Sequence, residues 1–271
     1  TVTLSLCLIF SPYDFCYYNM SMDFHIIHLQ TVDSTNTYLE GLARKGYPHG
    51  TVVIADTQTS GRGRYGRQWF SPPGKNIYMS ILLRPQKGTG LSDLSVLPLL
   101  AGVASLKAVE GLTGLEVMLK WPNDILLMEK KLGGILVESR IEGKTVFFIA
   151  GIGINVNMTL DELPEELKEI ATSLYICTGK EFSREELTER LLTEFSRIYE
   201  DFITHGKQYI ISEWQSHSST IGRRVRAVLP DGRTLSGRAV AVDENGFLLL
   251  DIDGRLEIIK AGDLFHEPDN H

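Results

Sequence analysis

Residues 59–69, TSGRGRYGRQW, combine closely spaced glycines with arginines, a composition suited to holding anions. The segment contains Gly61, Arg62, Gly63, Arg64, Gly66 and Arg67. Glycines let backbone amides approach a ligand closely, and planar guanidinium groups bind carboxylates or phosphates in bidentate fashion. Two unit negative charges about 4 Å apart repel by on the order of 4 kcal/mol at an effective dielectric of about 20. The segment therefore predicts a local site where permanent positive charge holds two anionic reactants together.

Three other interpretations explain this segment less well. The spacing G-x-G-x-x-G matches a dinucleotide-binding turn, but that turn opens a helix, and the Pro-Pro-Gly sequence at 72–74 excludes one. A phosphate-binding loop needs Lys followed by Ser or Thr where Arg67 and Gln68 stand. An arginine-glycine segment for nucleic acid has little support from one short cluster in an acidic chain. A clamp for carboxylate and phosphate groups is the favoured interpretation.

Three further segments carry polar groups that could meet such reactants. KWPND at 120–124 ends a predicted strand with an amine, an amide and a carboxylate, although an Asn-Asp turn after proline has the same composition. Lys131 precedes two glycines at the start of another predicted strand, where a surface lysine is the simpler interpretation. GIGINVN at 151–157 could let a ring system lie against bare backbone, or could serve only close packing. None of the three decides a function alone.

The charge of the chain favours a local anion site over a surface-wide one. The chain has 271 residues, of which 43% are hydrophobic, and 27 Lys and Arg against 34 Asp and Glu give a formal net charge of -7. Such a chain can bury a substantial core, and its negative charge argues against nucleic acid as a partner.

The cysteines and apolar runs indicate a cytoplasmic protein. Cys7, Cys16 and Cys177 form no C-x-x-C pair and cannot build a disulfide framework, which is typical of a reducing compartment. The histidines show no zinc spacing, so no metal site is expected in the protein itself. No apolar run approaches the roughly 18 residues of a membrane span.

The first 22 residues are interpreted as an N-terminal extension that is not native. They lack the basic start of a signal peptide, and Asp14 follows soon after their apolar part. Met20 or Met22 is a natural start, which favours this interpretation over a functional arm.

Hydrophobic periodicity places the polar segments in an α/β core. Strands are predicted over 24–32, 51–56, 76–84, 115–121, 131–140 and 144–157. The last is almost entirely apolar, which is typical of a strand buried on both faces. Helices are predicted at 37–46 after the N-capping side chains of DSTN, at 92–112 with Pro98 in the first turn, and from Ser183, where Glu186 completes a capping box.

A different pattern begins near the C-terminus. Between 221 and 264, short β runs are separated by PDGR, DENG and DIDG, each a tight-turn signal. About 50 residues of short strands at this spacing favour a small barrel appended to the main domain. The expected division is therefore a main domain at 23–217 and a small domain at 218–271.

Five segments, in their order along the chain, resemble the motif series of biotin protein ligases: DSTN, QTSGRGRYGRQW, KWPND, KLGGILVE and GIGINVN. The resemblance runs from about Phe24 to the C-terminal barrel. It implies an α+β fold, namely a catalytic domain like those of class II aminoacyl-tRNA synthetases, with a mixed sheet and helices, and a small SH3-like C-terminal domain.

The resemblance also implies two reactions. The biotin carboxylate attacks the α-phosphate of Mg-ATP to give biotinyl-adenylate and pyrophosphate, and a carrier lysine then attacks the acyl carbon. Biotin and ATP are thus the expected substrates, with Mg²⁺ as the metal. The expected partner is the biotin carboxyl carrier protein or domain of a biotin-dependent carboxylase, and formation of a homodimer is left open.

Site residues follow from the matched motifs. The residues implied for biotin are Ser34, Thr35, Asn36, Gln58, Gly61, Arg62, Gly63, Arg64, Lys131 and Gly133. Those implied for ATP are Arg64, Arg67, Trp69, Asn123, Lys131 and Asn155, with Trp69 as a face for adenine. The catalytic residues implied are Arg64, Lys131 and Asp124. Arg64 and Lys131 stabilise charge on the α-phosphate, and Asp124 orients the incoming lysine or accepts its proton.

Two departures from the family pattern matter. Tyr65 stands where some relatives carry another arginine, which affects how the loop orders or retains the adenylate. Bifunctional members carry a DNA-binding domain of roughly 60 residues before the motifs, whereas here the motifs begin almost at once, so a monofunctional ligase is expected. The alternatives are a lipoate-type ligase or acyltransferase of the same fold, and a regulator that only binds biotinyl-adenylate.

Overall fold

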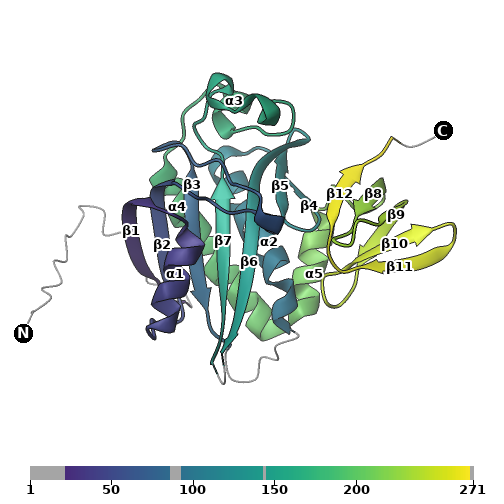
Figure 1. Ribbon diagram of the computed structural model, residues 1–271, viewed down its shortest axis with the longest axis horizontal. Coiled ribbons are helices and arrows are strands. Elements are labelled where there is room, and N and C mark those ends of the chain that lie inside the picture. The colour runs from purple at the N-terminus through teal and green to yellow at the C-terminus, as the bar shows by residue number, and fades with distance from the viewer. Residues whose placement is uncertain (1–21, 86–92, 143–144, 269–271) are drawn as a thin grey trace, which may run out of the picture.

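The computed structural model describes residues 22–85, 93–142 and 145–268 (Figure 1). The expected N-terminal extension lies outside these residues except for Met22, which is buried and donates its backbone N–H to Ser196 Oγ.

A seven-stranded sheet forms the centre of the main domain, in the order β1-β2-β3-β7-β6-β5-β4. Only β1 and β2 pair in parallel, and every other neighbouring pair is antiparallel, so the sheet is mixed. The strands are β1 (His25–Val32), β2 (Thr51–Gln58), β3 (Ile77–Leu83), β4 (Met118–Lys120), β5 (Asp124–Leu127), β6 (Lys130–Glu142) and β7 (Thr145–Ile154). The strand predicted at 115–121 is therefore shorter than expected.

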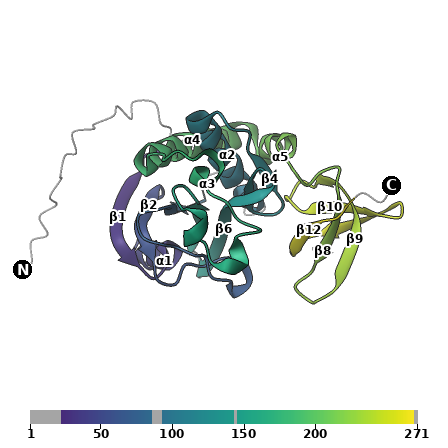
Figure 2. The same ribbon diagram turned by 90° about the horizontal axis from the view of Figure 1, so that it is seen from above.

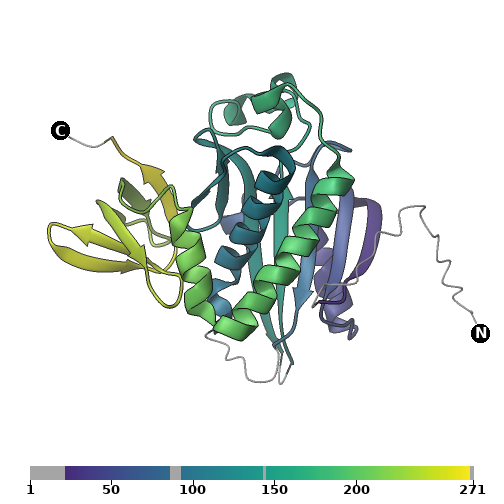
Figure 3. The ribbon, with the colours of Figure 1, turned by 180° about the vertical axis from the view of Figure 1, so that it is seen from behind.

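Helices cover both faces of this sheet. On one face lies α1 (Thr35–Arg44), seen in front of the strands in Figure 1. On the other lie α2 (Leu97–Thr113), α4 (Arg184–His205) and α5 (Lys207–Ser216), seen in Figure 3. A short helix, α3 (Leu174–Thr178), stands above the end of the sheet. Short 3-10 turns are Arg64–Gly66, Asp93–Val96, Leu160–Glu162 and Glu165–Leu167.

The central strand β7 confirms the prediction of burial on both faces. Phe147 and Ile149 pack into the smaller core under α1, whereas Ala150, Ile152 and Ile154 pack into the larger core under the other helices. This division follows from the strand geometry, because successive side chains point to opposite faces.

The helix starts differ in part from the predictions. Ser34 is the N-cap of α1, but its side chain makes no capping hydrogen bond. Ser183 does cap α4 by accepting from the backbone N–H of Glu186, but the Glu186 carboxylate pairs with Arg190 rather than closing a capping box. Pro98 lies in the first turn of α2, where its missing N–H is not needed.

Helix α2 together with its preceding turn, Asp93–Thr113, is long and apolar enough to cross a membrane, contrary to the sequence-based expectation. Of its most apolar window, 67% is buried inside the fold, between the sheet and α4. The helix is therefore a core helix by its packing, and its apolar composition reflects contact on nearly all sides.

A five-stranded antiparallel sheet forms the C-terminal part, in the order β11-β10-β9-β8-β12, and stands beside the β4 edge of the first sheet (Figure 2). Its strands are β8 (Arg224–Val228), β9 (Thr234–Val242), β10 (Leu248–Ile252), β11 (Arg255–Ile259) and β12 (Asp263–His266). The predicted turns are confirmed: Asp253 and Gly254 both have positive φ in the two-residue β10–β11 loop. The predicted barrel is not closed, because β11 and β12 do not pair across the described residues. The domain boundary at 217 stays a prediction.

Candidate active site

A cavity of about 500 Å³ opens at one end of the mixed sheet and brings the five polar segments together. Most of the predicted site residues line it: Ser34, Thr35, Asn36, Gln58, Arg62, Gly63, Arg64, Arg67, Trp69, Asn123, Asp124, Lys131 and Asn155. Gly61 and Gly133 do not line it. A Cβ on Gly61 would lie 2.6 Å from the carbonyl oxygen of Trp69, and one on Gly133 would lie 2.7 Å from that of Gly153. These two glycines therefore permit close packing behind the cavity wall.

One wall of the cavity, the polar wall, carries the uncharged side chains of Ser34, Thr35, Asn36 and Gln58. Gln58 Oε1 accepts from the backbone N–H of Thr35 at 2.9 Å and from Thr35 Oγ1 at 3.2 Å, so this side chain of the DSTN segment is held by β2. Ser80 Oγ lies 2.7 Å from Thr35 Oγ1 and 2.6 Å from Asn36 Oδ1. Ser80 is fully buried in β3 and was not among the site residues expected from the sequence. A polar residue within the apolar run IYMSILL is the signal that could have identified it.

Residues 59–69, called the arginine loop below, fold back on themselves beside this wall. Gly63 N–H donates to the Arg67 carbonyl at 2.7 Å, and Trp69 N–H donates to the Gly61 carbonyl at 2.8 Å. The tip is the 3-10 turn Arg64–Gly66, in which Tyr65 has φ of 55°. No helix follows the glycines, which confirms that this is not a dinucleotide-binding turn.

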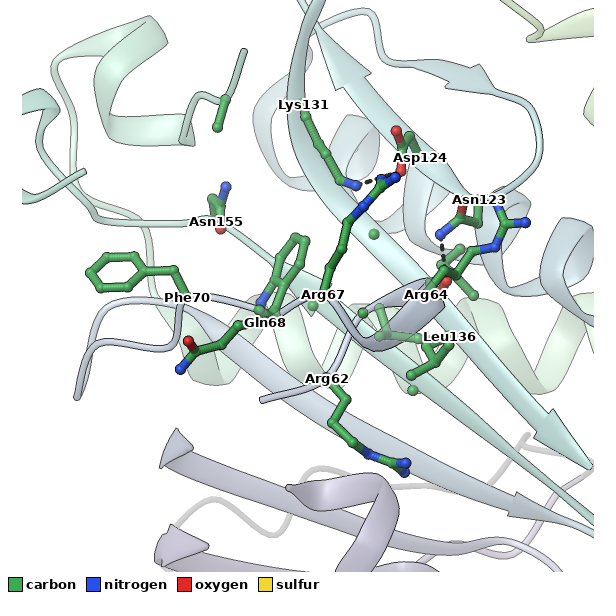
Figure 4. A pocket seen from close by; sticks show the side chains of 18 of the residues that line it. Arg62, Arg64, Arg67, Gln68, Phe70, Asn123, Asp124, Lys131, Leu136 and Asn155 are labelled. Carbon is green, nitrogen blue, oxygen red and sulfur yellow. Dashed lines mark hydrogen bonds and ion pairs between the residues drawn. The ribbon is translucent and has the colours of Figure 1, made fainter. Parts of the chain in front are cut away.

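The three arginines of this loop point in different directions (Figure 4). Arg62 pairs with Glu138 of β6, with its Nη2 2.6 Å from Oε2. Arg64 donates from Nη1 to Asn123 Oδ1 at 3.2 Å and to the Gly262 carbonyl at 3.1 Å, and from Nη2 to the Tyr65 hydroxyl at 2.8 Å.

The third arginine, Arg67, forms an ion pair with Asp263 of β12. Asp263, Leu264 and Phe265 of β12 line the cavity, so the C-terminal sheet supplies part of its wall. Asp263 was not among the expected site residues, because no local sequence pattern shows that the second sheet turns this strand toward the loop.

Lys131 of β6 and Asp124 of β5 form an ion pair, with Lys131 Nζ 2.6 Å from Asp124 Oδ1 (Figure 4). They are not opposite each other in the sheet, so the long lysine side chain reaches along the strand pair. Lys131 Nζ also lies 5.5 Å from the centre of the Trp69 ring. Lys120, on β4, faces the same region, and burial lowers its pKa. An amine, a carboxylate and the arginine loop thus meet where two anions could be held and an incoming amine could be deprotonated.

Trp69 lies against bare backbone. A Cβ on Gly153 would lie 2.7 Å from Trp69 Cε2, and one on Gly134 would lie 3.1 Å from Cζ3. The ring that packs on the glycines of GIGINVN is therefore this indole. Asn155 is buried nearby, where its Nδ2 donates to the Thr172 carbonyl at 2.9 Å.

A charged cluster joins the two sheets beside the cavity. Arg223 pairs with Glu129 at 2.8 Å, and this contact lowers the pKa of the Glu129 carboxyl. His266 lies next to both, with its Nδ1 4.0 Å from Glu129 Oε2. Burial, with the charges of Lys120 and Arg223, lowers the pKa of His266 to about 4, and the Glu129 charge opposes this only in part.

His266 is therefore expected to make the protein less stable in acid. Because its pKa falls from 6.5 in the unfolded chain to about 4 in the folded one, the unfolded state binds more protons between these values. Stability is then fully present above pH 6.5 and falls as the pH drops toward 4, by about 1–3 kcal/mol from this group. Thermal unfolding of His266→Gln should show a shallower loss over this window, and an unchanged slope would contradict the assignment.

Two family models match the chain. Residues 28–155 match the Biotin/lipoate A/B protein ligase family, and residues 220–266 match the Biotin protein ligase C terminal domain. The bifunctional ligase/repressor BirA of Bacillus spizizenii is 40% identical over 241 residues, which cover 89% of this chain and 73% of that relative. The chain belongs to the biotin protein ligase family.

Other members support this assignment. The biotin--[acetyl-CoA-carboxylase] ligase of Mycobacterium tuberculosis is 36% identical over 243 residues, covering 86% of this chain and 85% of that one. The solved biotin protein ligase of Aquifex aeolicus in complex with biotin and ATP superposes with a TM-score of 0.76 at 34% identity, covering 90% of this chain and 99% of that one. This member of the family thus shares both sequence and fold with known biotin protein ligases.

Proposed function

We propose that this biotin protein ligase activates biotin with ATP and transfers it to a lysine of a biotin carboxyl carrier domain. In the first step a biotin carboxylate oxygen bonds to the α-phosphorus while the bond to the pyrophosphate leaving group breaks. In the second step the lysine amine bonds to the acyl carbon, and AMP leaves. The observation that carries the proposal is the shared cavity, where an uncharged polar wall meets the arginine loop and the Lys131–Asp124 pair.

The uncharged wall suits the head of biotin. The ureido group of biotin is neutral and both donates and accepts hydrogen bonds, as do the hydroxyl and amide side chains of Ser34, Thr35, Asn36 and Gln58. Because Gln58 and Ser80 already fix Thr35 and Asn36, the wall is rigid before any substrate enters. Such a preorganised wall lowers the entropic cost of binding.

The cationic groups suit the reacting centre. Lys131 lines the cavity and pairs with Asp124 of KWPND, and from there it can bind oxygens of the biotin carboxylate and the α-phosphate. Arg64 lines the same cavity and can turn from Asn123 and Gly262 to these oxygens. Catalysis of the first step then rests on positioning and charge neutralisation, without a covalent enzyme intermediate.

Asp124 suits the second step. Once Lys131 has moved onto the phosphate, the Asp124 carboxylate is free to orient the carrier lysine and accept its proton. Closure of the loop over the bound adenylate also keeps water from the reactive mixed anhydride.

Trp69, Arg67 and Asn155 suit the nucleotide end of the cavity. The indole is held flat against β6 and β7 by the absence of side chains on Gly134 and Gly153. The indole is half-buried, and in this position its ring can stack with adenine.

Gly153→Ala is therefore expected to raise the KM for ATP about tenfold, because the new methyl group would displace the indole, at an overpacking cost of about 1–3 kcal/mol. Gly41→Ala is the matched control, because a Cβ on Gly41 meets nothing within 4 Å. Steady-state pyrophosphate release against ATP concentration measures both. An ATP KM equal to that of the parent would contradict the role given to Trp69.

Magnesium fits this site as a companion of ATP. No group of three His, Cys, Asp or Glu side chains able to hold a metal occurs in the described ranges 22–85, 93–142 and 145–268. Among the carboxylates that line the cavity, Asp124 and Asp263 are each paired with a cation. Mg²⁺ commonly keeps waters and binds through substrate phosphates with one or two carboxylates, which this donor set permits. We propose that it neutralises phosphate charge there.

Finer features of the family complete the proposal. The mixed sheet with helices on both faces suits a fold like that of class II aminoacyl-tRNA synthetases, and the small antiparallel sheet suits an SH3-like domain. The carrier domain of a biotin-dependent carboxylase is the proposed partner. A monofunctional ligase, a cytoplasmic location, a homodimer and the absence of nucleic acid as a partner stay predictions.

Pyrophosphate release with biotin and with lipoate, each added separately, tests the first step. Purified protein incubated with ATP should release pyrophosphate when biotin is added and should not do so with lipoate. Release with lipoate alone would assign the protein to the lipoate-type alternative, and binding of biotinyl-adenylate without any release would assign it to the non-catalytic regulator.

A further inference from the structure

Glu138 on β6 connects the arginine loop to the polar wall of the cavity. Its Oε2 accepts from Arg62 Nη2 at 2.6 Å and from Asn36 Nδ2 at 2.9 Å. Its Oε1 lies 3.3 Å from Arg140 Nη2, and Arg140 in turn pairs with Glu40 of α1. The Glu138 side chain is 17% exposed, so solvent screens these contacts only partly.

Glu138 fixes the orientation of the Asn36 amide. Asn36 Nδ2 donates both to Glu138 and to the Leu136 carbonyl, so this end of the amide faces acceptors only. The Oδ1 end accepts from Ser80 Oγ. An amide flipped by 180° would direct its oxygen at a carboxylate, and the Glu138 charge therefore sets which end of Asn36 joins the network around Thr35.

The same oxygen holds Arg62 away from the reacting centre. In Figure 4 the Arg62 side chain extends to the opposite side of the loop from Lys131 and Arg67. A 2.6 Å contact between a guanidinium and a carboxylate is slightly shorter than the usual charge-assisted hydrogen bond between these groups. The backbone of Gly61 and Gly63 is paired with Trp69 and Arg67, so anchoring Arg62 anchors the base of the whole hairpin.

We propose that Glu138 is a positioning residue that anchors the arginine loop through Arg62 and couples it to the polar wall through Asn36. On this proposal, which rests on the proposed function, the Arg62 guanidinium is a loop anchor rather than a ligand of the biotin carboxylate. Glu138 then acts mainly on substrate binding, because it sets the shape of the biotin wall and the position of the loop, and touches none of the reacting atoms.

Glu138→Gln tests the anchor directly, because the amide can still accept from Asn36 but loses the charge that holds Arg62. Trypsin cleavage after Arg64 and Arg67 of the native protein, followed by mass spectrometry, reports how often the loop leaves its place. Cleavage is expected to be about tenfold faster in Glu138→Gln. Glu40→Gln, which removes an equal charge from the same network without touching the loop, should cleave within about twofold of the parent rate. Equal rates in Glu138→Gln and Glu40→Gln would overturn the proposal.

Kinetics separate positioning from a direct role for Arg62. For Glu138→Gln the KM for biotin should rise about tenfold, with kcat for pyrophosphate release changed less than about threefold. Arg62→Gln and the double variant should show the same KM as Glu138→Gln, because the pair acts as one unit. If the KM of the double variant rose by the product of the two single increases, the proposal would be contradicted. A fall in kcat with an unchanged KM would contradict it as well.

The proposal can fail separately from the proposed function. If Glu138→Gln does not fold, Arg62→Gln gives the same cleavage readout, because Arg62 has a side chain 38% exposed and outside the core. If the parent releases no pyrophosphate with biotin, the proposed function fails, while the cleavage rates still decide whether Glu138 anchors the loop.

Discussion

Arg64→Ala and Lys131→Ala are each expected to slow biotinyl-adenylate formation by about 10²- to 10³-fold, the usual effect of removing one donor that stabilises a developing negative charge. In the first step a carboxylate must approach a triphosphate, and these two cations line the cavity where both anions would lie. Water cannot replace either cation without slowing the reaction. Water dipoles must reorient as charge develops in the transition state, whereas a fixed cation needs no such reorganisation. Biotin-dependent pyrophosphate release under saturating substrates measures the effect.

A matched control separates this effect from general loss of charge. Arg190→Ala removes a cation from the exposed surface of α4, where its partner is Glu186, and should leave the rate near that of the parent. Arg64 also contacts the Gly262 carbonyl, so the melting temperature of Arg64→Ala must be measured alongside. Near-parental pyrophosphate release in Arg64→Ala or Lys131→Ala would contradict the account of the first step.

Asp124→Asn is expected to spare adenylate formation and to slow transfer to the carrier lysine by about 10²-fold, the lower end of general-base effects. The carboxamide keeps the size and one oxygen of Asp124 but cannot take a proton from the incoming ammonium group. Asp124 and Lys131 form an ion pair at 2.6 Å, so Asp124→Asn and Lys131→Ala change the two partners of one contact. Loss of Lys131 should act on the first step and loss of the Asp124 charge on the second.

Single-turnover kinetics distinguish the two steps. Preformed biotinyl-adenylate bound to each variant is mixed with carrier domain, and the appearance of biotinylated carrier is followed. The transfer rate of Asp124→Asn is expected to rise steeply with pH toward the parental value, because more of the carrier lysine then arrives deprotonated. Slow pyrophosphate release in Asp124→Asn, equal to that of Lys131→Ala, would show that the pair acts as one unit in the first step.

Local sequence patterns predicted those parts of the fold that depend on local physics. The all-apolar run in β7 predicted burial on both faces, and Asp253-Gly254 predicted a tight turn, because each depends on the residues themselves. The DSTN segment was expected to cap α1, yet the side chains of Thr35 and Asn36 contact Gln58 and Ser80 instead. Tertiary contacts with two other strands outweigh the local capping bond there.

The candidate site was predicted only where a motif marks it. Lys131 and Asp124 were assigned from separate motifs, and the pairing of their two strands brings the side chains within reach of each other. Asp263 could not have been assigned, because its role depends on how the second sheet docks beside the loop. Glu138 was visible in KLGGILVE, but its meaning comes from Arg62 and Asn36, which precede it by 76 and 102 residues.

The most direct test of the central claim is the mass of a biotin carboxyl carrier domain after incubation with the protein, ATP, Mg²⁺ and biotin. The carrier domain should gain the mass of one biotinyl group, located on a single lysine by peptide sequencing, and should gain nothing when ATP or biotin is omitted. A carrier domain that stays unmodified, or that is modified with lipoate and not with biotin, would contradict the assignment.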